Sequence, residues 1–406
     1  MTRDDCYMAK IGLIDLSSET MSEFPSKGWE GYLGGKILNQ RILLELLTGT
    51  ETAFSDENPI ILSTGPLTGT GAPGSMRFDI ASLSPKDNRP AFSNCGGLFG
   101  LYMKKAGYAA LILTGRCKEK RWLEINEERI IFHDATELWG TSVSQCQDMI
   151  AQHLEDPHVG KLCIGPAGEN LVKFATVIAD GHSTGRAGIG AVFGWKNLKA
   201  VTVTGRKTLS LVDAEKVAAL NREWYASLKR QGQRENDHSG KACCTGCPLH
   251  CAKHDRESNG ILNELGMDAI AAADAVRWAE EQGFAAPDLY EDIAYRRGIG
   301  KKIAEGVPGR KGKGGNRRGG SYQAIAAAFH LPPDAPETKE FCKNLTEAIS
   351  AAGQCMFTVN ALEADAALPV IHMLSLVTGM EMDLEKLLEI GGRSQELQRQ
   401  LCDRFQ

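Results

Sequence analysis

Short aliphatic and β-branched runs separated by glycine-rich turns fill the first half of the chain, a pattern typical of β-strands. Two runs, Trp122–Ile125 and Ile130–His133, are separated by only four residues and predict an antiparallel hairpin. This hairpin argues against an all-parallel sheet. Nine strands are predicted in this half, at Lys10–Leu16, Ile60–Ser63, Phe78–Ser82, Ala109–Thr114, Trp122–Ile125, Ile130–His133, Lys161–Ile164, Phe174–Ala179 and Ala200–Thr204.

Helical patterns are few before residue 206 and dominate after it. The first half predicts helices at Gly35–Leu47, Gly97–Ala106 and Ser142–His153. After Gly205 the apolar positions recur with a period near 3.6, which indicates amphipathic helices. The predicted helices there are Asp213–Leu228, Asp268–Glu281, Leu289–Arg297, Lys301–Glu305, Lys339–Ala352, Ala361–Thr378 and Asp383–Arg404.

Two of these helices have clear end signals. Asp213 is placed to cap a helix whose apolar stripe carries Val217, Leu220, Trp224 and Leu228. Asp268 is placed in the same way before a second helix, and a glycine at position 283 is a typical stop signal. Local capping chemistry therefore supports the helical assignment of the second half.

The two patterns together predict an α+β protein. A β-rich N-terminal domain of antiparallel and mixed sheets is expected over residues 1–208, followed by an all-helical region over residues 209–406. No internal sequence repeat and no long heptad pattern is evident. The basic, glycine-rich segment Gly309–Gly320 is expected to be a flexible solvated loop, with a docking patch for an acidic partner as the alternative.

Composition narrows the class of protein. Lys and Arg number 46 against 51 Asp and Glu, so the net charge of −5 favours neither nucleic acid nor an anionic membrane as a partner. No apolar run approaches the roughly 18 residues that a membrane helix needs, and the N-terminus lacks the apolar stretch of a signal peptide. Twelve cysteines in such a chain indicate reduced thiols, metal ligation or redox chemistry, so a soluble, cytoplasmic protein is expected.

The strongest chemical signal is a cysteine cluster. Its spacing, C-x2-C-x3-C, is formed by Cys244, Cys247 and Cys251. Thiolates at this spacing suit an iron–sulfur cluster or zinc, and coincidence is the third interpretation. His250 or His254 would complete a zinc site, whereas a [4Fe–4S] cluster needs a fourth cysteine, for which Cys355 is the best remote candidate.

Three glycine-rich segments form a second group of candidates: Ser63–Ser75, Ser93–Gly100 and Gly181–Val192. Each can present backbone N–H groups to an anion, although none matches a known phosphate-loop code. Taken alone, each is more typical of a structural turn. Taken with a metal cluster, they indicate a large, multiply phosphorylated cofactor held between loops.

These segments resemble the tungsten-containing aldehyde ferredoxin oxidoreductases, of which this would be a short member. The resemblance is carried by motifs that begin at Gly31 (GYLGGK), Thr64 (TGPLTGTGAP), Ser93 (SNCGG), Ile164 (IGPAGEN), Gly188 (GIGAV), Asn197 (NLKA), Cys244 (CxxCPxxC), Asn263 (NELGMD) and Gly353 (GQCMFT). Their order along the chain makes the resemblance far more specific than any single loop.

The resemblance implies a cofactor and the residues that hold it. The β-rich domain would be the base for a tungsten or molybdenum bis-pyranopterin, with Mg2+ at its phosphates as a further candidate. Ligands of a [4Fe–4S] cluster would be Cys244, Cys247, Cys251 and Cys355. Cofactor-binding residues would be Arg77 between cluster and pterin, Asn94 and Gly96 at the phosphates and Mg2+, Gly185, Arg186 and Gly188 in a second phosphate turn, and Asn263 and Asp268 at a pterin.

The resemblance also implies an activity. The protein would be an oxidoreductase of anaerobic metabolism that oxidises an aldehyde-type small molecule and passes electrons to ferredoxin or an iron–sulfur partner subunit. A homo-oligomer is also compatible with the family. Two family segments that supply an active-site Glu and His have no counterpart here; Glu264 and His330 are the candidate substitutes, although a lone histidine in this apolar context is more typical of a core.

Those missing segments leave two other hypotheses open. The first is a non-catalytic, compact family member that acts as an electron-transfer or cofactor-binding subunit. The second is an interaction protein stabilised by zinc at the cysteines.

Overall fold

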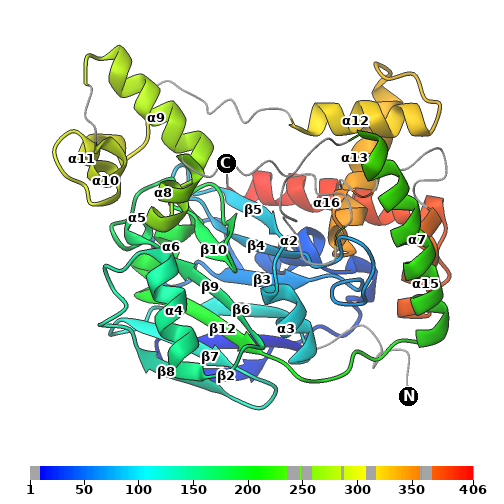
Figure 1. The fold of residues 1–406 in the computed structure, drawn as a ribbon, viewed down its shortest axis with the longest axis horizontal. Helices are drawn as coiled ribbons and strands as arrows, with labels where there is room; N and C mark the ends of the chain where they lie inside the picture. Colours follow the sequence, from blue (N-terminus) through cyan, green and yellow to red (C-terminus); the bar gives the residue numbers. More distant parts are fainter. Residues whose placement is uncertain are drawn as a thin grey trace.

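The computed structural model describes residues 10–235, 247, 258–284, 288–307, 317–356, 358 and 368–405. The strands gather in the lower part of the molecule in Figure 1, and helices from the second half of the chain lie above them and along the right-hand side. No strand follows residue 204 within these described ranges. The predicted α+β class is therefore confirmed, and the domain division at residue 208 stays a prediction.

The first sheet contains six strands in the order β2-β1-β6-β3-β4-β5. Only β1 and β6 are parallel; each of the other neighbours pairs in the antiparallel direction. Residues of β3 and β4 are buried throughout, so these strands form the centre of the core. The strands are β1 (Lys10–Asp15), β2 (Thr20–Glu23), β3 (Ile60–Thr64), β4 (Phe78–Leu83), β5 (Pro90–Cys95) and β6 (Tyr108–Thr114).

The second sheet repeats the topology of the first. Its order, β8-β7-β12-β9-β10-β11, places each strand where the strand six numbers earlier stands in the first sheet. Its one parallel pair, β7 and β12, also corresponds to β1 and β6. The strands are β7 (Arg121–Ile125), β8 (Ile130–Asp134), β9 (Val159–Ile164), β10 (Val177–Ala179), β11 (His182–Thr184) and β12 (Leu198–Thr204).

Helices of the strand-rich half follow the same repeat. In each sheet, one helix precedes the strand at the fourth position, β3 or β9, and another precedes the strand at the third position, β6 or β12. These are α2 (Gly35–Leu46) and α4 (Val143–Leu154) in the first role, and α3 (Phe99–Lys105) and α6 (Ile189–Trp195) in the second. The expectation of no internal repeat therefore holds for the amino-acid sequence and is wrong for the topology, because strand order is set by non-local pairing.

All nine predicted strands are present, and the hairpin of β7 and β8 is antiparallel as expected. Three strands were missed: β2, β5 and β11. Each of the three lacks the run of apolar β-branched residues that marks a strand in the sequence. β2 is a mostly exposed polar edge strand, β5 begins with proline and ends Ser-Asn-Cys, and β11 lies inside a glycine-rich segment.

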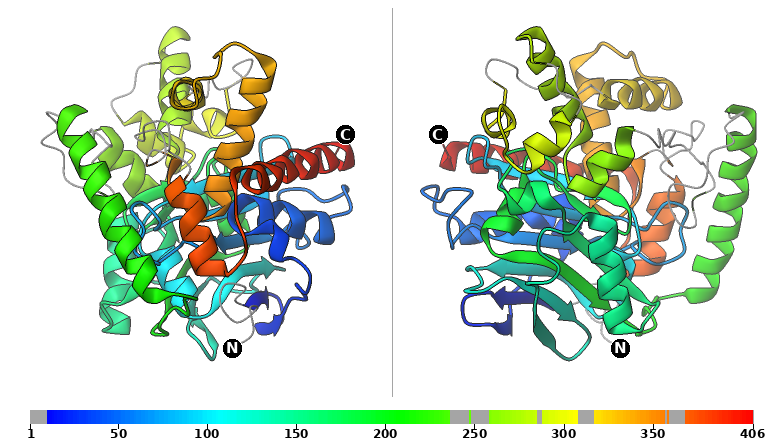
Figure 2. Two further views of the ribbon diagram at one scale, coloured as in Figure 1. Left: turned by 90° about the vertical axis from the view of Figure 1, so that its right-hand side faces the viewer. Right: turned by 60° about the vertical axis from the view of Figure 1, so that its left-hand side comes forward.

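The helical half falls into two groups. The helices α8 to α11 have their own apolar cluster next to the second sheet, whereas α13 and α16 pack on α2 of the first sheet. In both views of Figure 2, α7 stands at the side of the molecule. The helices of this half are α7 (Ala214–Glu235), α8 (Ser258–Leu265), α9 (Ala269–Glu281), α10 (Leu289–Ala294), α11 (Gly300–Ile303), α12 (Arg317–Ala328), α13 (Pro336–Ala351), α15 (Leu368–Thr378) and α16 (Leu384–Arg404); η1 (Glu30–Tyr32) and α5 (Pro166–Glu169) belong to the strand-rich half.

The predicted helix signals are confirmed. The carboxylate of Asp213 accepts a hydrogen bond from the Lys216 N–H at 3.0 Å, and the apolar stripe of α7 is buried at Val217, Trp224 and Leu228. Asp268 caps α9 through the N–H groups of the first turn. Part of the loop prediction is wrong, because residues 317–320 belong to α12; residues 309–316 lie outside the described part of the chain.

No helix in the described residues has the length and apolar character to cross a membrane.

Candidate cofactor site

The predicted cluster ligand Cys355 lies against the first glycine-rich loop. Its backbone N–H donates to the Gly74 carbonyl at 3.1 Å. A Cβ atom on Gly74 would lie 3.2 Å from the Cβ of Cys355, so this approach needs a glycine. The hydroxyl of Thr68 continues the contact by donating to the Arg77 carbonyl at 2.8 Å. The loop therefore brings two predicted site residues, distant in sequence, into one local structure.

Arg77 and Asn94 are joined directly. The Nε of Arg77 donates to Oδ1 of Asn94 at 2.5 Å, and the amide nitrogen of Asn94 donates to Oδ2 of Asp79 at 2.8 Å. Asp79 and Asn94 are direct partners across β4 and β5. Two residues predicted separately are thus linked to a third, Asp79, which no sequence motif marks.

Asp79 is a buried carboxyl group, only 3% exposed. Burial raises its pKa to about 7, against the opposing effects of the Asn94 hydrogen bond and the charges of Arg77 and Lys36. The nearby Glu347 carboxylate raises the pKa further, although Glu347 is itself paired with Lys36 at 2.8 Å. The site therefore includes a buried cluster of opposite charges beneath the predicted cofactor residues.

The second glycine-rich segment, which contains Gly96, is organised by a carboxylate from the other sheet. Oδ2 of Asp180 accepts hydrogen bonds from the N–H groups of Leu98 at 2.9 Å and Phe99 at 2.8 Å. Its Oδ1 accepts a third bond, from the Lys161 N–H at 3.0 Å. Two N–H groups at the start of α3 are thus used by the protein itself, and an anion at this turn would have to bind before them, nearer Gly96.

The third segment reaches the second through a tight hairpin. Asp180 and Gly181 both have positive φ angles, 47° and 83°, which is the Asp-Gly signature of a type I′ turn between β10 and β11. This turn places the Thr184 hydroxyl of β11 3.4 Å from the Ser93 hydroxyl of β5. The segments that begin at residues 93 and 181 therefore lie side by side.

Cys95 lies between these segments as a neutral thiol. Its Sγ donates to the carbonyl oxygens of Gly96 at 3.1 Å and His182 at 3.7 Å. Burial raises its pKa to about 12, so it is protonated at neutral pH.

Arg186 and Asp268 form an ion pair. The Nε of Arg186 lies 3.1 Å from Oδ2 of Asp268, whose other oxygen caps α9. The Arg186 side chain is 55% exposed, in contrast to the half-buried Arg77. Gly185 and Gly188 flank it with positive φ angles of 68° and 87° that form the turn into α6. Near the end of α8, the carbonyl of Asn263 accepts a hydrogen bond from the Gly266 N–H. Asn263 therefore lies at the turn that leads to Asp268 and its ion pair with Arg186.

The cysteines are described only in part. Cys247 and Cys355 are each 8% exposed, and Cys244 and Cys251 lie outside the described residues. The described surroundings of Cys355 fit a bound group: the adjacent Gln354 is 1% exposed, and its Oε1 has no hydrogen-bond partner among the described residues. A buried acceptor of this kind needs a donor, and a pterin N–H would supply one.

The two candidate substitutes for the family's active-site Glu and His are Glu264, which is bonded to Ser144, and His330, which is exposed. Glu264 accepts hydrogen bonds from the Ser144 N–H at 2.9 Å and hydroxyl at 2.8 Å; these outweigh the effect of burial and lower its pKa. His330 is exposed just after α12, with a φ angle of 52°, so the expectation of a core histidine is wrong. Neither side chain is arranged as a general base.

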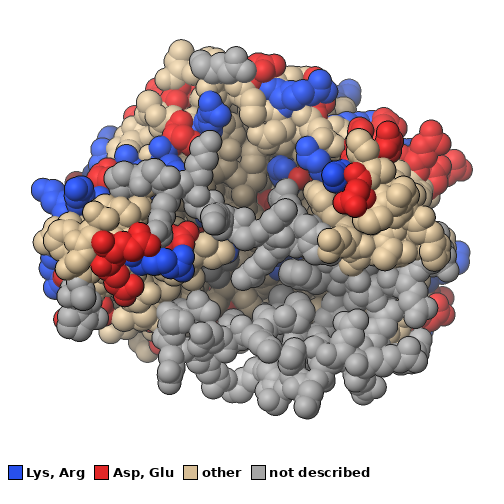
Figure 3. Space-filling model, turned by 90° about the horizontal axis from the view of Figure 1, so that it is seen from above, with Lys and Arg blue, Asp and Glu red and all other residues tan. Residues whose placement is uncertain are grey.

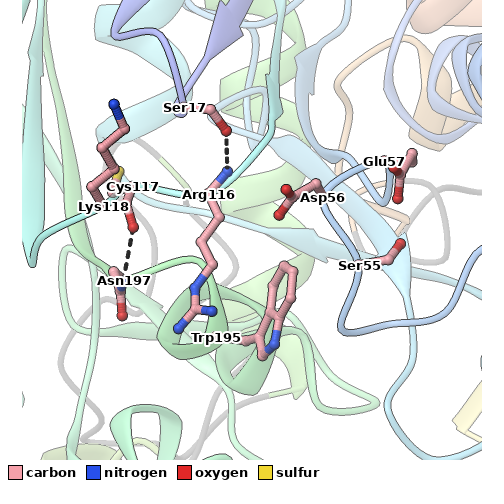
Figure 4. A pocket seen from close by; sticks show the side chains of 9 residues that line it. All are labelled: Ser17, Ser55, Asp56, Glu57, Arg116, Cys117, Lys118, Trp195 and Asn197. Carbon is pink, nitrogen blue, oxygen red and sulfur yellow. Dashed lines mark hydrogen bonds between the residues drawn. The ribbon is translucent and has the colours of Figure 1, made fainter.

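The pocket shown in Figure 4 is a separate feature. It has a volume of about 670 Å3 and lies where β3 begins and β6 ends, opposite the cofactor loops at the far end of β3. The Arg116 guanidinium stacks 5.0 Å from the Trp195 ring, and the Asn197 amide donates to the Cys117 carbonyl. No predicted site residue lines it.

Figure 3 shows the molecule from above the view of Figure 1. Acidic and basic side chains are interspersed around a central hollow on the described part of this face (Figure 3).

These features define an α+β class of protein in which two sheets of one topology carry glycine-rich loops and a helical second half covers them. Residues 11–205 match the family model described as "Aldehyde ferredoxin oxidoreductase, N-terminal domain". A tungsten-containing aldehyde ferredoxin oxidoreductase of Pyrococcus furiosus is 28% identical, over 93% of this chain and 85% of the relative. The chain belongs to the aldehyde ferredoxin oxidoreductase family.

Other relatives match a shorter stretch. The tungsten-containing aldehyde ferredoxin oxidoreductase of Pyrococcus horikoshii is 39% identical over 55% of this chain and 37% of the relative. The "Aliphatic sulfonate oxidoreductase, WOR-like subunit" of P. furiosus is 32% identical over 64% of this chain and 42% of its own length.

The fold also matches a solved structure. The complex described as "Active site complex BamBC of Benzoyl Coenzyme A reductase in complex with 1,5 Dienoyl-CoA" superposes with a TM-score of 0.82, covering 98% of this chain and 89% of that chain. At 20% identity this likeness establishes the shared fold alone.

Proposed function

We propose that this family oxidoreductase binds a tungsten or molybdenum bis-pyranopterin and a [4Fe–4S] cluster, oxidises an aldehyde-type substrate, and passes the electrons to ferredoxin or an iron–sulfur partner. The observation that carries the proposal is the convergence of Cys355, the glycine-rich loop and Arg77. The thiol is soft-ligand chemistry for iron, and the guanidinium can donate to phosphate and to cluster sulfur. Cys355 and Arg77 would thus offer a ligand for the cluster and hydrogen-bond donors for the pterin phosphates.

Each part of the site has a physical task in this proposal. The bound metal would supply the two-electron chemistry of substrate oxidation. Arg77, held through its Nε by Asn94, would direct its terminal nitrogens toward anionic groups. The turns with Gly96 and with Gly185 and Gly188 would allow phosphates to approach the backbone closely, with Mg2+ as counter-ion. Asn263 and Asp268 would contact a pterin on the α8–α9 side.

The electron acceptor is proposed from chemistry and from relatives. A cluster bound by Cys244, Cys247, Cys251 and Cys355 would be a one-electron carrier, so its partner must also carry single electrons. The structurally similar benzoyl-CoA reductase chain is part of a complex, and the sulfonate oxidoreductase relative is called a subunit. A ferredoxin or an iron–sulfur subunit fits both indications, and a homo-oligomer is compatible with them.

The test combines composition and turnover. The full chain, produced and purified anaerobically, is expected to contain about four Fe, tungsten or molybdenum, and a pterin that fluoresces after oxidative release. It should then reduce a viologen dye with simple aldehydes as substrates. Loaded protein with no turnover on any aldehyde would refute the activity while leaving the cofactor assignment in place.

A specific observation favours one alternative, a non-catalytic subunit that binds the same cofactors. Ser144 holds the Glu264 carboxylate, and His330 is exposed, so neither candidate residue replaces the missing base. This alternative predicts full loading and a cluster that exchanges electrons with a partner, but no aldehyde-dependent dye reduction. Zinc in place of iron at the cysteines would instead support the interaction protein.

A further inference from the structure

We propose that Asp79 is a positioning residue that fixes the Asn94 amide and, through it, the Arg77 guanidinium in the orientation the cofactor requires. The inference rests on the proposed cofactor site and adds to it a residue outside every motif used to identify the family. The observation behind it is a line of two hydrogen bonds: Arg77 Nε donates to the oxygen of the Asn94 amide, and the nitrogen of that amide donates to Asp79 Oδ2.

Strand register builds this line. Asp79 and Asn94 are direct partners on β4 and β5, so their side chains lie on the same face of the sheet. Arg77 lies at the end of the glycine-rich loop, one residue before β4, and its Nε reaches Asn94. The hairpin therefore pairs Asp79 with Asn94, and the loop that enters β4 adds Arg77.

The chemistry of Asp79 decides the direction of the line. An asparagine amide can turn over and exchange its donor and acceptor ends. The Oδ2 atom of Asp79 accepts from the nitrogen end of Asn94, and this bond turns the oxygen end of the amide toward Arg77. An asparagine at position 79 would be compatible with either orientation and would remove this selection.

The bond to Asn94 uses the Nε of Arg77. The terminal nitrogens of a guanidinium are the pair that makes forked contacts with anions. An Arg77 anchored through Nε has its plane fixed by the protein before any anion arrives. This pre-organisation reduces the loss of side-chain freedom when the phosphate or the cluster binds.

Asp79 also lies where the two parts of the site meet. A Cβ on Gly35 would lie 2.8 Å from Asp79 Oδ2 and 3.1 Å from the Cα of Ala351, so the start of α2 and the end of α13 both close over the carboxyl group. The chain then runs from Ala351 to Cys355. The acid under the pterin residues is thus packed against the segment that carries a cluster ligand.

Packing alone does not account for a carboxyl group at this place. A carboxyl that is 3% exposed is unfavourable in a core unless it is paired, and an apolar residue of similar size is often neutral or stabilising. Its direct hydrogen-bond partner is Asn94, a predicted cofactor residue. The burial is therefore explained by what Asp79 does to Asn94 and Arg77.

The test compares D79N with a matched control in the full chain, purified anaerobically. E169Q is the control, because the Glu169 side chain is similarly buried at 3% but pairs with Lys199, away from the predicted cofactor residues. We expect D79N to lose about tenfold in pterin and tungsten or molybdenum per chain, as loss of a second-layer partner does at metal sites. Pterin, metal and iron content should stay near wild type in E169Q, and Tm should fall no more in D79N than in E169Q.

A crystal structure of D79N supplies a readout that does not depend on loading. The expected result is an Asn94 amide turned over and an Arg77 Nε no longer within hydrogen-bond distance of it. Wild-type pterin content in D79N, or an unchanged Arg77 orientation, would overturn the inference alone. A wild-type protein without pterin or metal would overturn the proposed function, and the variant structure would still decide whether Asp79 orients Arg77.

Discussion

The two six-stranded halves of the β-rich region share one topology and place different chemistry at corresponding positions. In the first half, the turn after β5 follows Asn94, which is tied to a half-buried arginine and a buried acid. In the second half, the turn after β11 carries Arg186, which is 55% exposed and pairs with Asp268. The repeated topology thus carries two arginines in different settings. Arg77 is fixed by residues of the sheet, and Arg186 is held by the carboxylate that caps α9.

The difference indicates how the site is divided. The first half is covered by α2 and α13, so its polar groups are buried and fixed before any ligand arrives. The second half meets α8 and α9 through the Ser144–Glu264 hydrogen bonds, the Ala175–Met267 bridge and the Arg186–Asp268 ion pair, yet the Arg186 side chain stays 55% exposed. We expect the first half to set the properties of the cluster and the second half to set affinity for one end of the cofactor.

The largest expected effect is at the cluster. C355S should abolish assembly of a four-iron cluster, because a serine oxygen is a poor substitute for a thiolate ligand. Iron analysis and the electron paramagnetic resonance signal of the reduced protein measure this directly. C402S is the control, since Cys402 is exposed, and it should keep its iron. Full iron and an unchanged signal in C355S would remove Cys355 from the site.

The next effect compares the two arginines. R77K should lower pterin content about tenfold and shift the cluster potential, because a lysine cannot keep the Nε anchor while reaching an anion. R186K should lower pterin content by a smaller factor and leave the potential unchanged, since the Arg186 side chain is largely exposed. Redox titration and pterin release of both variants measure the contrast. Equal effects would contradict the division between the halves.

A third effect concerns the carboxylate that ties the halves together. D180A should lower the free energy of unfolding by about 2–3 kcal/mol, because it leaves two N–H groups of α3 without their acceptor. Urea unfolding measures the change. D156A is the control, because Asp156 caps the His158 N–H in an exposed turn, and its loss should be smaller. A larger loss in D156A would mean that Asp180 does not hold the sheets together.

The smallest effect is on pH dependence. Burial raises the pKa of Asp79 to about 7 in the folded protein, so folding favours its protonated form. The stability from this proton is complete below the unfolded value near 3.8 and is lost as the pH rises through about 7. Tm between pH 5 and 8 should therefore fall more steeply in the wild type than in D79N. Parallel curves would show that Asp79 is ionised throughout.

Local signals in the sequence predicted a large part of this protein. Asp213 and Asp268 identified helix starts because capping depends on the next two or three residues. The motifs carrying Asn94 and Cys355 were visible because each is a short, ordered pattern. The structure then shows Arg77 and Asn94 joined by a hydrogen bond, and Cys355 on the loop that leads to Arg77.

The sequence did not reveal what depends on pairing between distant segments. The topological repeat is a property of strand order, and no residue pattern marks it. Asp79 looks like one polar residue in a buried strand until the register places it opposite Asn94. Asp180 lies just before a glycine-rich segment, but its role depends on α3, whose Phe99 is 81 residues earlier in the chain. Such residues are found only when the fold brings their partners together.

The most direct test of the central claim is elemental and pterin analysis of one anaerobic preparation of the full chain. The account predicts about four Fe per chain, with tungsten or molybdenum and a releasable pterin in the same sample. Zinc at the cysteines, with neither iron nor pterin after reconstitution under reducing conditions, would contradict it.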